Sequence, residues 1–532
     1  MLTYHFVVFN NLDNNINSWV NIGYIASYIL ANSSVCVQFS FYTVDEVDTA
    51  IQEIYAAHPA IIGLPILQHN FYSALSFCEQ IKKLLPDIYI LLGNKEAVCY
   101  GRYIMENNPA IDAIILGEGE VTTSEVCNCI SLNRDLSKCP GLMIRRGEEI
   151  FETPPRPLIE NLDDLPFPYR GFRVGNGNFY NIIGSRGCAG HCSFCESNTI
   201  FDKNSYTHSP VRSRSISNIL DEVVVLSNEK NFVVINFLDS TFCSNDAEAI
   251  NRLEELYSQI ISRKLNFQFN INIRSEQVNE EFIDCLVKLS RVGLDSVLVG
   301  IEAGNSDDIR IYNKGADLNT HRHAIDLLNR QLDKTPNIIG VEYGFINFNP
   351  YSTIEKLEEN ADFALNNSLT LYPFDIMSKL RISGSTTITR KIEKDGLLLG
   401  NSKEPLVDPY AYKFIDSRVY KLYNVLSEAF TIFHVPNTSL VLSKLRRFSL
   451  HEKLDPQIRE KAISLDKTVG EVTLRIFQKG LRLVKNSKPY DSLYAYAAEQ
   501  NERIKELSRE VKKIENRVSA NLLKIGELPH HI

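Results

Sequence analysis

Between residue 4 and about residue 130, the hydrophobic positions alternate between two kinds of pattern. Short apolar runs such as YHFVVFNN, AIIGLPIL and IYILLG have the length and composition of buried strands. They are separated by stretches such as FYSALSFCEQIKKLL, in which apolar residues recur every three or four positions. Strands that alternate with helices predict an α/β fold with a doubly wound parallel sheet of the Rossmann type. Such sheets bind ligands at the carboxyl ends of their strands, here the loops at 10–15, 67–70, 93–95 and 117–120.

A second alternation begins near residue 178. Its strand candidates are NFYNIIGS, NFVVINFL, NFQFNINI, LDSVLVGI, IGVEYGFI and IMSKLRIS, with amphipathic stretches between them. Six strand-helix units predict a complete or partial (β/α) barrel, whose chemistry belongs at the carboxyl ends of the strands. The polar residues expected there include a three-cysteine loop, Asp239, Arg274, Glu302, the segment 347–351 and Arg381.

Prolines and a change of pattern divide the chain. Six prolines between residues 140 and 176 disfavour helix and central strand and predict an extended connector. Beyond about residue 390 the pattern is mostly helical and lacks cysteine. We therefore expect domains at 1–139 and 177–390, a linker at 140–176 and a helical region at 391–532. The last helix has a nearly heptad apolar stripe, which indicates either docking on its own domain or self-association.

Composition narrows the classes of protein. A formal net charge of -9 supplies no overall field that would attract nucleic acid or anionic lipid. We identify no signal peptide and no apolar run of the roughly 18 residues that a membrane span needs. Eleven cysteines without an export signal predict reduced thiols in the cytoplasm, with metal or catalytic roles more typical than disulfides.

The segment SRGCAGHCSFCES contains the candidate metal ligands Cys188, Cys192 and Cys195, directly after a predicted strand. Three thiolates on one short loop can hold three irons of a cubane cluster and leave the fourth iron open to a small chelating molecule. The alternatives are a zinc site, for which His191 is the nearby fourth ligand, and buried cysteines without a metal.

This spacing, with the aromatic Phe194 before the last cysteine, resembles the signature of the radical S-adenosylmethionine (SAM) superfamily. Similar features follow in order: Asp239 in FLDSTF, Arg274, and Glu302 with Gly304 in VGIEAGN. The resemblance implies a 4Fe-4S cluster on the three cysteines and contacts from these groups to S-adenosylmethionine. The alternatives are helix caps for the two carboxylates and a structural ion pair for Arg274.

The first half of the chain narrows the resemblance to the cobalamin-binding branch of that superfamily. RPLIENLDDLPFPYRG is similar to its linker, and AIDAIILGEGEVT is similar to the end of its cobalamin domain. The resemblance implies cobalamin as a further cofactor and these contacts: Leu67, Gln68, Gly93, Asn94, Gly117, Glu118, Gly119 and Glu120.

The chain departs from that branch in two places. It lacks a D-x-H-x-x-G motif, so a histidine ligand to cobalt is not expected. It reads LLGNKEAV, with Asn94 and Lys95, where many relatives have two glycines. The alternative is a domain that keeps the fold without the cofactor.

Cys243 and Tyr351 are the candidate catalytic residues, because both follow predicted barrel strands. Cys243 could donate hydrogen or contact substrate, and Tyr351 could line the substrate pocket. Core packing is the alternative for each.

The resemblance implies that a 5'-deoxyadenosyl radical attacks an unactivated carbon, most simply to C-methylate a peptide or a natural-product intermediate. It also implies an electron donor such as flavodoxin or ferredoxin. Rearrangement, cyclisation or oxidation without methyl transfer remains open, as does a non-catalytic iron-sulfur or cobalamin sensor. Radical methylthiolation of transfer RNA fits poorly, because the chain is acidic and has no basic tail.

Overall fold

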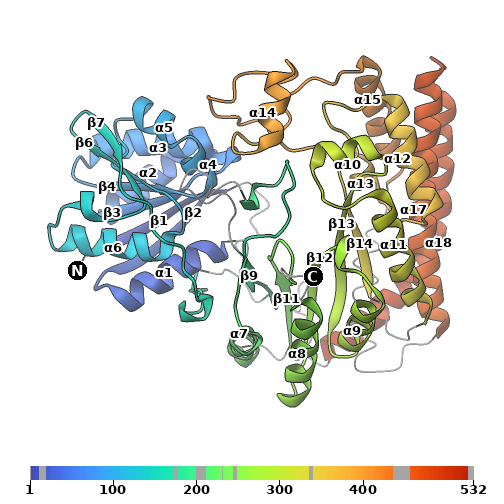
Figure 1. Ribbon diagram of the computed structural model, residues 1–532, viewed down its shortest axis with the longest axis horizontal. Helices are drawn as coiled ribbons and strands as arrows, with labels where there is room; N and C mark the ends of the chain where they lie inside the picture. Colours follow the sequence, from blue (N-terminus) through green and yellow to red (C-terminus); the bar gives the residue numbers. More distant parts are fainter. Residues whose placement is uncertain are drawn as a thin grey trace. The chain divides into compact units, whose positions relative to one another are not determined.

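The computed structural model describes residues 2–10, 19–172, 177–198, 211–229, 232–243, 248–334, 339–434 and 456–524. Contacts divide the chain into two compact units. Unit 1 comprises residues 1–175, 195–213 and 382–411, and unit 2 comprises residues 176–194, 214–381 and 412–532. Each unit has its own sheet (Figure 1). The expected ligand loop at 10–15 lies outside the described residues from residue 11 onward.

Unit 1 contains a seven-stranded sheet with the strand order β2-β1-β3-β4-β5-β6-β7. The first five strands are parallel, which confirms the predicted doubly wound α/β fold. The strands are β1 (Thr3–Asn10), β2 (Cys36–Thr43), β3 (Ile61–Pro65), β4 (Tyr89–Gly93), β5 (Ala113–Ile115), β6 (Leu142–Arg146) and β7 (Glu149–Glu152). The helices are α1 (Val20–Asn32), α2 (Val47–Ala57), α3 (Phe71–Leu84), α4 (Lys95–Cys99), α5 (Gly101–Asn107) and α6 (Gly119–Ser131).

Strand β1 shows why this sheet is covered on both faces. Its successive side chains point to opposite faces, so Phe6 and Val8 enter one hydrophobic cluster while Val7 and Phe9 enter the other. Helices α1 and α6 pack together over the first face, and α2 and α3 pack together over the second (Figure 1). A strand buried on both faces has a nearly continuous apolar sequence, as YHFVVFNN does.

The expected linker at 140–176 contains more structure than its prolines indicate. Residues 142–152 form the antiparallel hairpin β6-β7, which extends the sheet beyond β5. Pro140 precedes the hairpin, and the hairpin turns at Gly147, whose φ is +61°. The apolar runs LMI and IF lie on either side of a polar turn, and the prolines lie outside the paired positions, so two short strands can form.

Unit 2 contains a parallel five-stranded sheet with the order β14-β13-β12-β11-β8. Consecutive helices pack beside one another on the outside of this partial barrel (Figure 1). The strands are β8 (Phe179–Ile182), β11 (Val233–Phe237), β12 (Phe267–Arg274), β13 (Leu294–Glu302) and β14 (Gly340–Phe345). The helices are α7 (Ile216–Glu229), α8 (Ala249–Ser262), α9 (Glu280–Ser290), α10 (Ser306–Tyr312), α11 (Leu318–Lys334), α12 (Ile354–Asn366) and α13 (Pro373–Ile376).

The sixth expected barrel strand, IMSKLRIS, is reduced in the described chain to a single bridge between Phe348 and Lys379. The Ile382 amide donates instead to the Pro409 carbonyl at 2.8 Å, within unit 1. Residues 382–411, with helix α14 (Thr387–Lys394), therefore pack with the first unit. The sixth unit of the predicted partial barrel is thus present among the described residues only as this bridge, in which the Phe348 amide donates to Ser378 and the Leu380 amide donates to Phe348.

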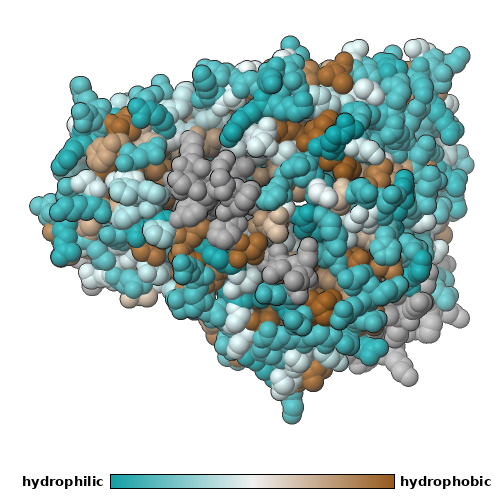
Figure 2. All heavy atoms as spheres, viewed as in Figure 1, coloured by the Kyte–Doolittle hydropathy of each residue, from teal (hydrophilic) through white to brown (hydrophobic). Residues whose placement is uncertain are grey.

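Helices α15 (Ser417–Ile432), α17 (Pro456–Lys485) and α18 (Asp491–Lys524) close unit 2. They share one hydrophobic cluster with the barrel, to which α18 contributes Leu493, Ala497 and Ile504. This packing fits the first interpretation of the apolar stripe, docking on its own domain. Among the described residues, no helix combines the length and the apolar character needed to cross a membrane. On the face shown in Figure 2, hydrophilic side chains predominate and hydrophobic ones form small scattered groups.

Candidate active site

The cysteine loop follows β8 and the short strand β9 (Ser185–Arg186). Cys188, Cys192 and Cys195 form no disulfide and are partly exposed, so a ligand can reach them. The Gly190 amide donates to the Cys188 Sγ at 3.4 Å. Cys188 and Cys192 belong to unit 2, while Cys195 begins the segment 195–213 of unit 1. Among the described residues, no three His, Cys, Asp or Glu side chains are arranged to hold one metal ion.

Arg274, at the end of β12, supplies positive charge beside the loop. A Cβ added to Gly190 would lie 1.8 Å from Arg274 Nη1 and 3.5 Å from the Cys188 Sγ. The guanidinium pairs with Glu276 and donates to the Lys314 carbonyl at 3.2 Å. Burial lowers the pKa of Arg274, but Glu276 and the nearby cysteines outweigh burial and raise it. A side chain at residue 190 would therefore have to displace the guanidinium, and this cation lies near the thiols of Cys188 and Cys192.

Glu302, at the end of β13, forms a nearly buried ion pair with Lys314. Glu302 Oε1 lies 3.0 Å from Lys314 Nζ, and the two side chains are 12% and 6% exposed. The backbone of Glu302 is left-handed, with φ +68°, which is uncommon for a residue other than glycine. Burial lowers the pKa of Lys314, but Glu302 and Cys192 outweigh burial and raise it. The sequence prediction missed Lys314, because a lysine after a helix gives no signal that distinguishes it from a surface charge.

Gly304 follows the same strand but packs against α12. Its amide donates to Asn360 Oδ1 at 2.8 Å, and an added Cβ would lie 2.5 Å from the Phe363 side chain. The close approach of the chain after β13 to α12 explains why residue 304 is glycine.

Asp239 is buried after β11, and both its oxygens accept hydrogen bonds from the residues that precede the cysteine loop. The Gly184 amide donates to one oxygen at 2.9 Å, and the Ser185 hydroxyl donates to the other. Burial raises the pKa of Asp239 to about 6, although these hydrogen bonds oppose the shift. The geometry therefore has Asp239 holding the start of the loop.

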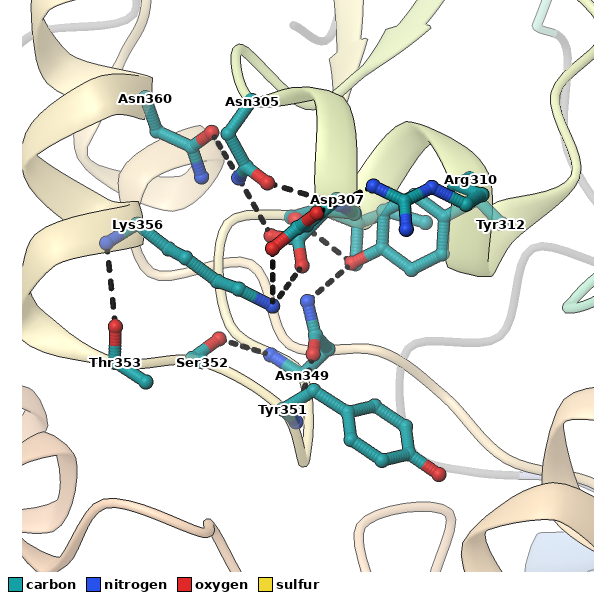
Figure 3. A network of polar contacts seen from close by, with 12 residues as sticks. Asn305, Asp307, Arg310, Tyr312, Asn349, Tyr351, Ser352, Thr353, Lys356 and Asn360 are labelled. Carbon is teal, nitrogen blue, oxygen red and sulfur yellow. Dashed lines mark hydrogen bonds and ion pairs between the residues drawn. The ribbon is translucent and has the colours of Figure 1, made fainter.

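The two catalytic candidates occupy different surroundings. Cys243 is fully buried in the hydrophobic cluster of unit 2, where its Sγ lies 3.8 Å from the Ala249 carbonyl. Tyr351 is 9% exposed, and its amide donates to Asn349 Oδ1 at 2.8 Å. In Figure 3 the Tyr351 ring points away from the polar network around Asn349.

In unit 1, Leu67 and Gln68 form the turn after β3. The Leu67 amide donates to Asn70 Oδ1 at 2.8 Å. The Gln68 side chain donates to the carbonyls of Ile382 and Leu406 at 2.9 and 2.8 Å. Gln68 thus attaches residues 382–411 to the sheet.

The loop after β4 contains Gly93, Asn94 and Lys95. Asn94 is left-handed in φ, at +74°, and its side chain accepts a hydrogen bond from the Lys95 amide at 2.7 Å. Lys95 forms an ion pair with Glu196, the residue after Cys195, and both belong to unit 1. Beside them, burial raises the pKa of Glu96 to about 7. The Lys95–Glu196 pair was not anticipated, because 101 residues separate its partners.

Gly117, Glu118, Gly119 and Glu120 join β5 to α6. Glu118 Oε2 accepts hydrogen bonds from the Ile159 amide at 2.8 Å and from Arg212 at 3.0 Å. The Glu118 side chain is 7% exposed, and Glu120 is also buried. This pairing holds the chain segment after the hairpin, and the two glycines are partly exposed at the strand end.

The described residues thus present a set of strand-end loops in unit 1 and, in unit 2, two cations near the thiols of the cysteine loop. Comparison with known proteins identifies both domains: "Radical SAM superfamily" matches residues 182–363, and "B12 binding domain" matches residues 15–127. The chain therefore combines a radical SAM domain with a B12-binding domain, and these two domains imply a 4Fe-4S cluster, S-adenosylmethionine and cobalamin as cofactors.

The individual relatives share less than 30% sequence identity with this chain. An uncharacterized methyltransferase from Pyrococcus horikoshii is 27% identical over 58% of this chain and 64% of its own length. An anaerobic magnesium-protoporphyrin IX monomethyl ester cyclase from Synechocystis sp. is 26% identical over 51% of each chain. The aligned part thus spans between half and two thirds of these relatives. A structure of the cobalamin-dependent SAM radical enzyme OxsB shares the fold, with a TM-score of 0.69 and 16% identity over 99% of this chain and 82% of that one.

Proposed function

We propose that this protein is a cobalamin-dependent radical SAM methyltransferase that methylates an unactivated carbon of a peptide or natural-product intermediate. The observation that carries the proposal is the pairing of a B12-binding domain with a radical SAM domain on one chain. When bound, the cluster and S-adenosylmethionine would supply a carbon-centred radical, and cobalamin would supply the methyl group. The protein supplies orientation and access.

In unit 2, Cys188 and Cys192, together with Cys195, would ligate the cluster. Arg274 and Lys314 offer positive charge next to these thiols, suited to the carboxylate of S-adenosylmethionine. Glu302 holds Lys314 in place, and its carboxylate suits an ammonium or a ribose hydroxyl. Partly exposed thiols beside fixed cations fit the cluster and its ligand.

In unit 1, the turn at 67–70 would lie against the lower face of cobalamin, and residues 117–120 would lie near its nucleotide tail. The expected spectrum is that of base-off cobalamin, because the chain has no histidine ligand motif. His69 lies in this turn and is exposed. Replacing His69 with Ala should leave the spectrum unchanged, and a protein that never retains cobalamin would contradict this part of the proposal.

Product stoichiometry tests the whole proposal. Methyl transfer needs one S-adenosylmethionine for the radical and another to remethylate cobalamin. The reconstituted enzyme, incubated without oxygen with a candidate substrate and a flavodoxin or ferredoxin reducing system, should yield 5'-deoxyadenosine and S-adenosylhomocysteine in equal amounts. The product should be heavier by one methylene unit.

The cyclase among the relatives supports a second candidate, a radical cyclisation or oxidation without methyl transfer. That reaction would produce 5'-deoxyadenosine with little S-adenosylhomocysteine and no added methylene mass. The same assay therefore separates the two functions.

A further inference from the structure

The last turn of α10 holds the cysteine loop through several contacts. The Ser193 amide donates to the Tyr312 carbonyl at 2.8 Å, and the Ser193 hydroxyl donates to the Ile311 carbonyl at 2.7 Å. The Phe194 ring meets the Tyr312 ring edge-on, with 5.4 Å between centroids. All these residues belong to unit 2. The stretch between the second and third cysteines is therefore shaped by one helix end.

The Tyr312 hydroxyl contacts a second segment, the residues that follow β14. It donates to the Ile346 carbonyl at 3.1 Å and accepts a hydrogen bond from Asn349 Nδ2 at 2.9 Å. Asn349 Oδ1 in turn accepts the amide of Tyr351, the candidate substrate-pocket residue. Figure 3 shows this path from the Tyr312 ring through Asn349 to the backbone of Tyr351. Tyr312 is 0% exposed, so its hydroxyl has no access to water as a replacement partner.

The opposite end of α10 is fixed to α12. Asn305 caps the helix by accepting the Asp308 amide at 2.8 Å, and its own amide group donates to Asn360 at 2.9 Å. The buried Asp308 lies 3.5 Å from Lys356 Nζ. A short helix anchored at both ends cannot shift without breaking buried polar contacts, which is costly.

We propose that Tyr312 is a positioning residue that holds the cysteine loop and the segment 346–352 in one fixed register. The ring and the carbonyl of Tyr312 hold the cysteine loop, and its hydroxyl holds the segment 346–352. This rests on the proposed function, in which a radical formed beside the cysteine loop must meet a substrate carbon near Tyr351. Small displacements of reacting groups reduce productive transfer strongly.

The substitution Tyr312→Phe separates the two supports, because it keeps the ring and carbonyl and removes the hydroxyl. In cluster-free protein, amide hydrogen exchange should rise about tenfold in peptides covering 346–352 and stay unchanged in those covering 188–195. In loaded enzyme, cluster content should stay unchanged while the ratio of product to 5'-deoxyadenosine falls about tenfold. Tyr312→Ala also removes the ring, and should raise exchange in both segments.

Tyr343 on β14 offers a matched control. It is also buried, and its hydroxyl has no hydrogen-bond partner among the described residues. Tyr343→Phe should change neither the exchange nor the product ratio. Unchanged exchange at 346–352 and an unchanged ratio in Tyr312→Phe would overturn the proposal. If the wild-type enzyme formed no methylated product, the proposed function would fail, yet the exchange measurement would still decide whether Tyr312 couples the two segments.

Discussion

Polar side chains at the strand ends of the two units are used differently. In unit 1, Gln68 and Glu118 bind the protein's own backbone and thereby attach later segments of the chain to the sheet. In unit 2, Arg274 at the end of β12 lies near the thiols of the cysteine loop, and Glu302 at the end of β13 holds Lys314 near them. Whether a particular side chain meets a cofactor depends on which partners inside the protein already engage its polar atoms.

The largest effect is expected from the three thiols of the cysteine loop. Replacing Cys188, Cys192 and Cys195 together with Ala should abolish the visible absorbance of the cluster and the cleavage of S-adenosylmethionine, because the irons would lose their thiolate ligands. Absorption spectra and 5'-deoxyadenosine assays measure both. The buried Cys285→Ala serves as the control and should keep the cluster. A full cluster in the triple variant would contradict the assignment.

Substitutions of Arg274 test whether the cation beside the cysteine loop binds S-adenosylmethionine. Arg274→Gln should lower kcat/KM for S-adenosylmethionine cleavage about 10- to 100-fold, since hydrogen bonds to charged groups are worth about 1.5–3 kcal/mol. Arg274→Lys keeps the charge without the planar fork and should recover part of the loss. The partly exposed Arg263, which pairs with Asp221, provides Arg263→Gln as a control. Equal kinetics for Arg274→Gln and the control would make Arg274 a purely structural ion pair.

Glu96 tests the electrostatics of the strand end in unit 1. Its pKa is raised from 4.5 to about 7 by burial, so the folded state favours the protonated form. The resulting contribution to stability is present below about pH 4.5 and is lost as the pH rises to 7. Glu96→Gln should remove this dependence and make the protein more stable at pH 8, by up to about 3 kcal/mol. Urea unfolding at pH 5 and pH 8 measures it, with the exposed Glu106→Gln as control. Parallel pH profiles for Glu96→Gln and wild type would count against the raised pKa.

Substitution of Gln68 gives the smallest expected effect. It is also the sharpest test of the difference between the strand ends of the two units. Gln68→Leu removes two hydrogen bonds to the backbone and should destabilise the protein by about 1–3 kcal/mol. Proteolysis within 382–411 should become faster. The exposed Gln80→Leu should change stability by less than about 0.5 kcal/mol. If stability stayed constant while cobalamin affinity fell, Gln68 would be a cofactor contact after all.

The period of the hydrophobic pattern was sufficient to predict both sheets. It failed in two places, for different reasons. The hairpin at 142–152 is local, and the prolines on either side of it favoured an extended connector instead. The Ile382 amide leaves the expected sixth strand for Pro409, a partner that lies outside a window of ten or fifteen residues.

The candidate site was partly predictable for a related reason. Three cysteines with fixed spacing are conspicuous, and Arg274 and Glu302 follow from their places at strand ends. Lys314 and Tyr312 were missed, because their importance arises from the path of the chain after β13, which brings α10 against the cysteine loop. The orientation of Asp239 toward Gly184 also depends on the tertiary fold, because 55 positions separate the two residues.

The return of residues 382–411 to unit 1 has a consequence for biosynthesis. The acceptors of the Gln68 side chain, the carbonyls of Ile382 and Leu406, emerge from the ribosome more than 300 residues after Gln68 itself. At roughly 5–20 residues per second, the first sheet must wait about 15–70 s for them. During that interval the nascent chain carries a sheet without the segment that Gln68 binds after the central strand β3. Chaperone contact with the nascent chain should therefore be concentrated on this sheet, and should end once residue 411 has left the exit tunnel.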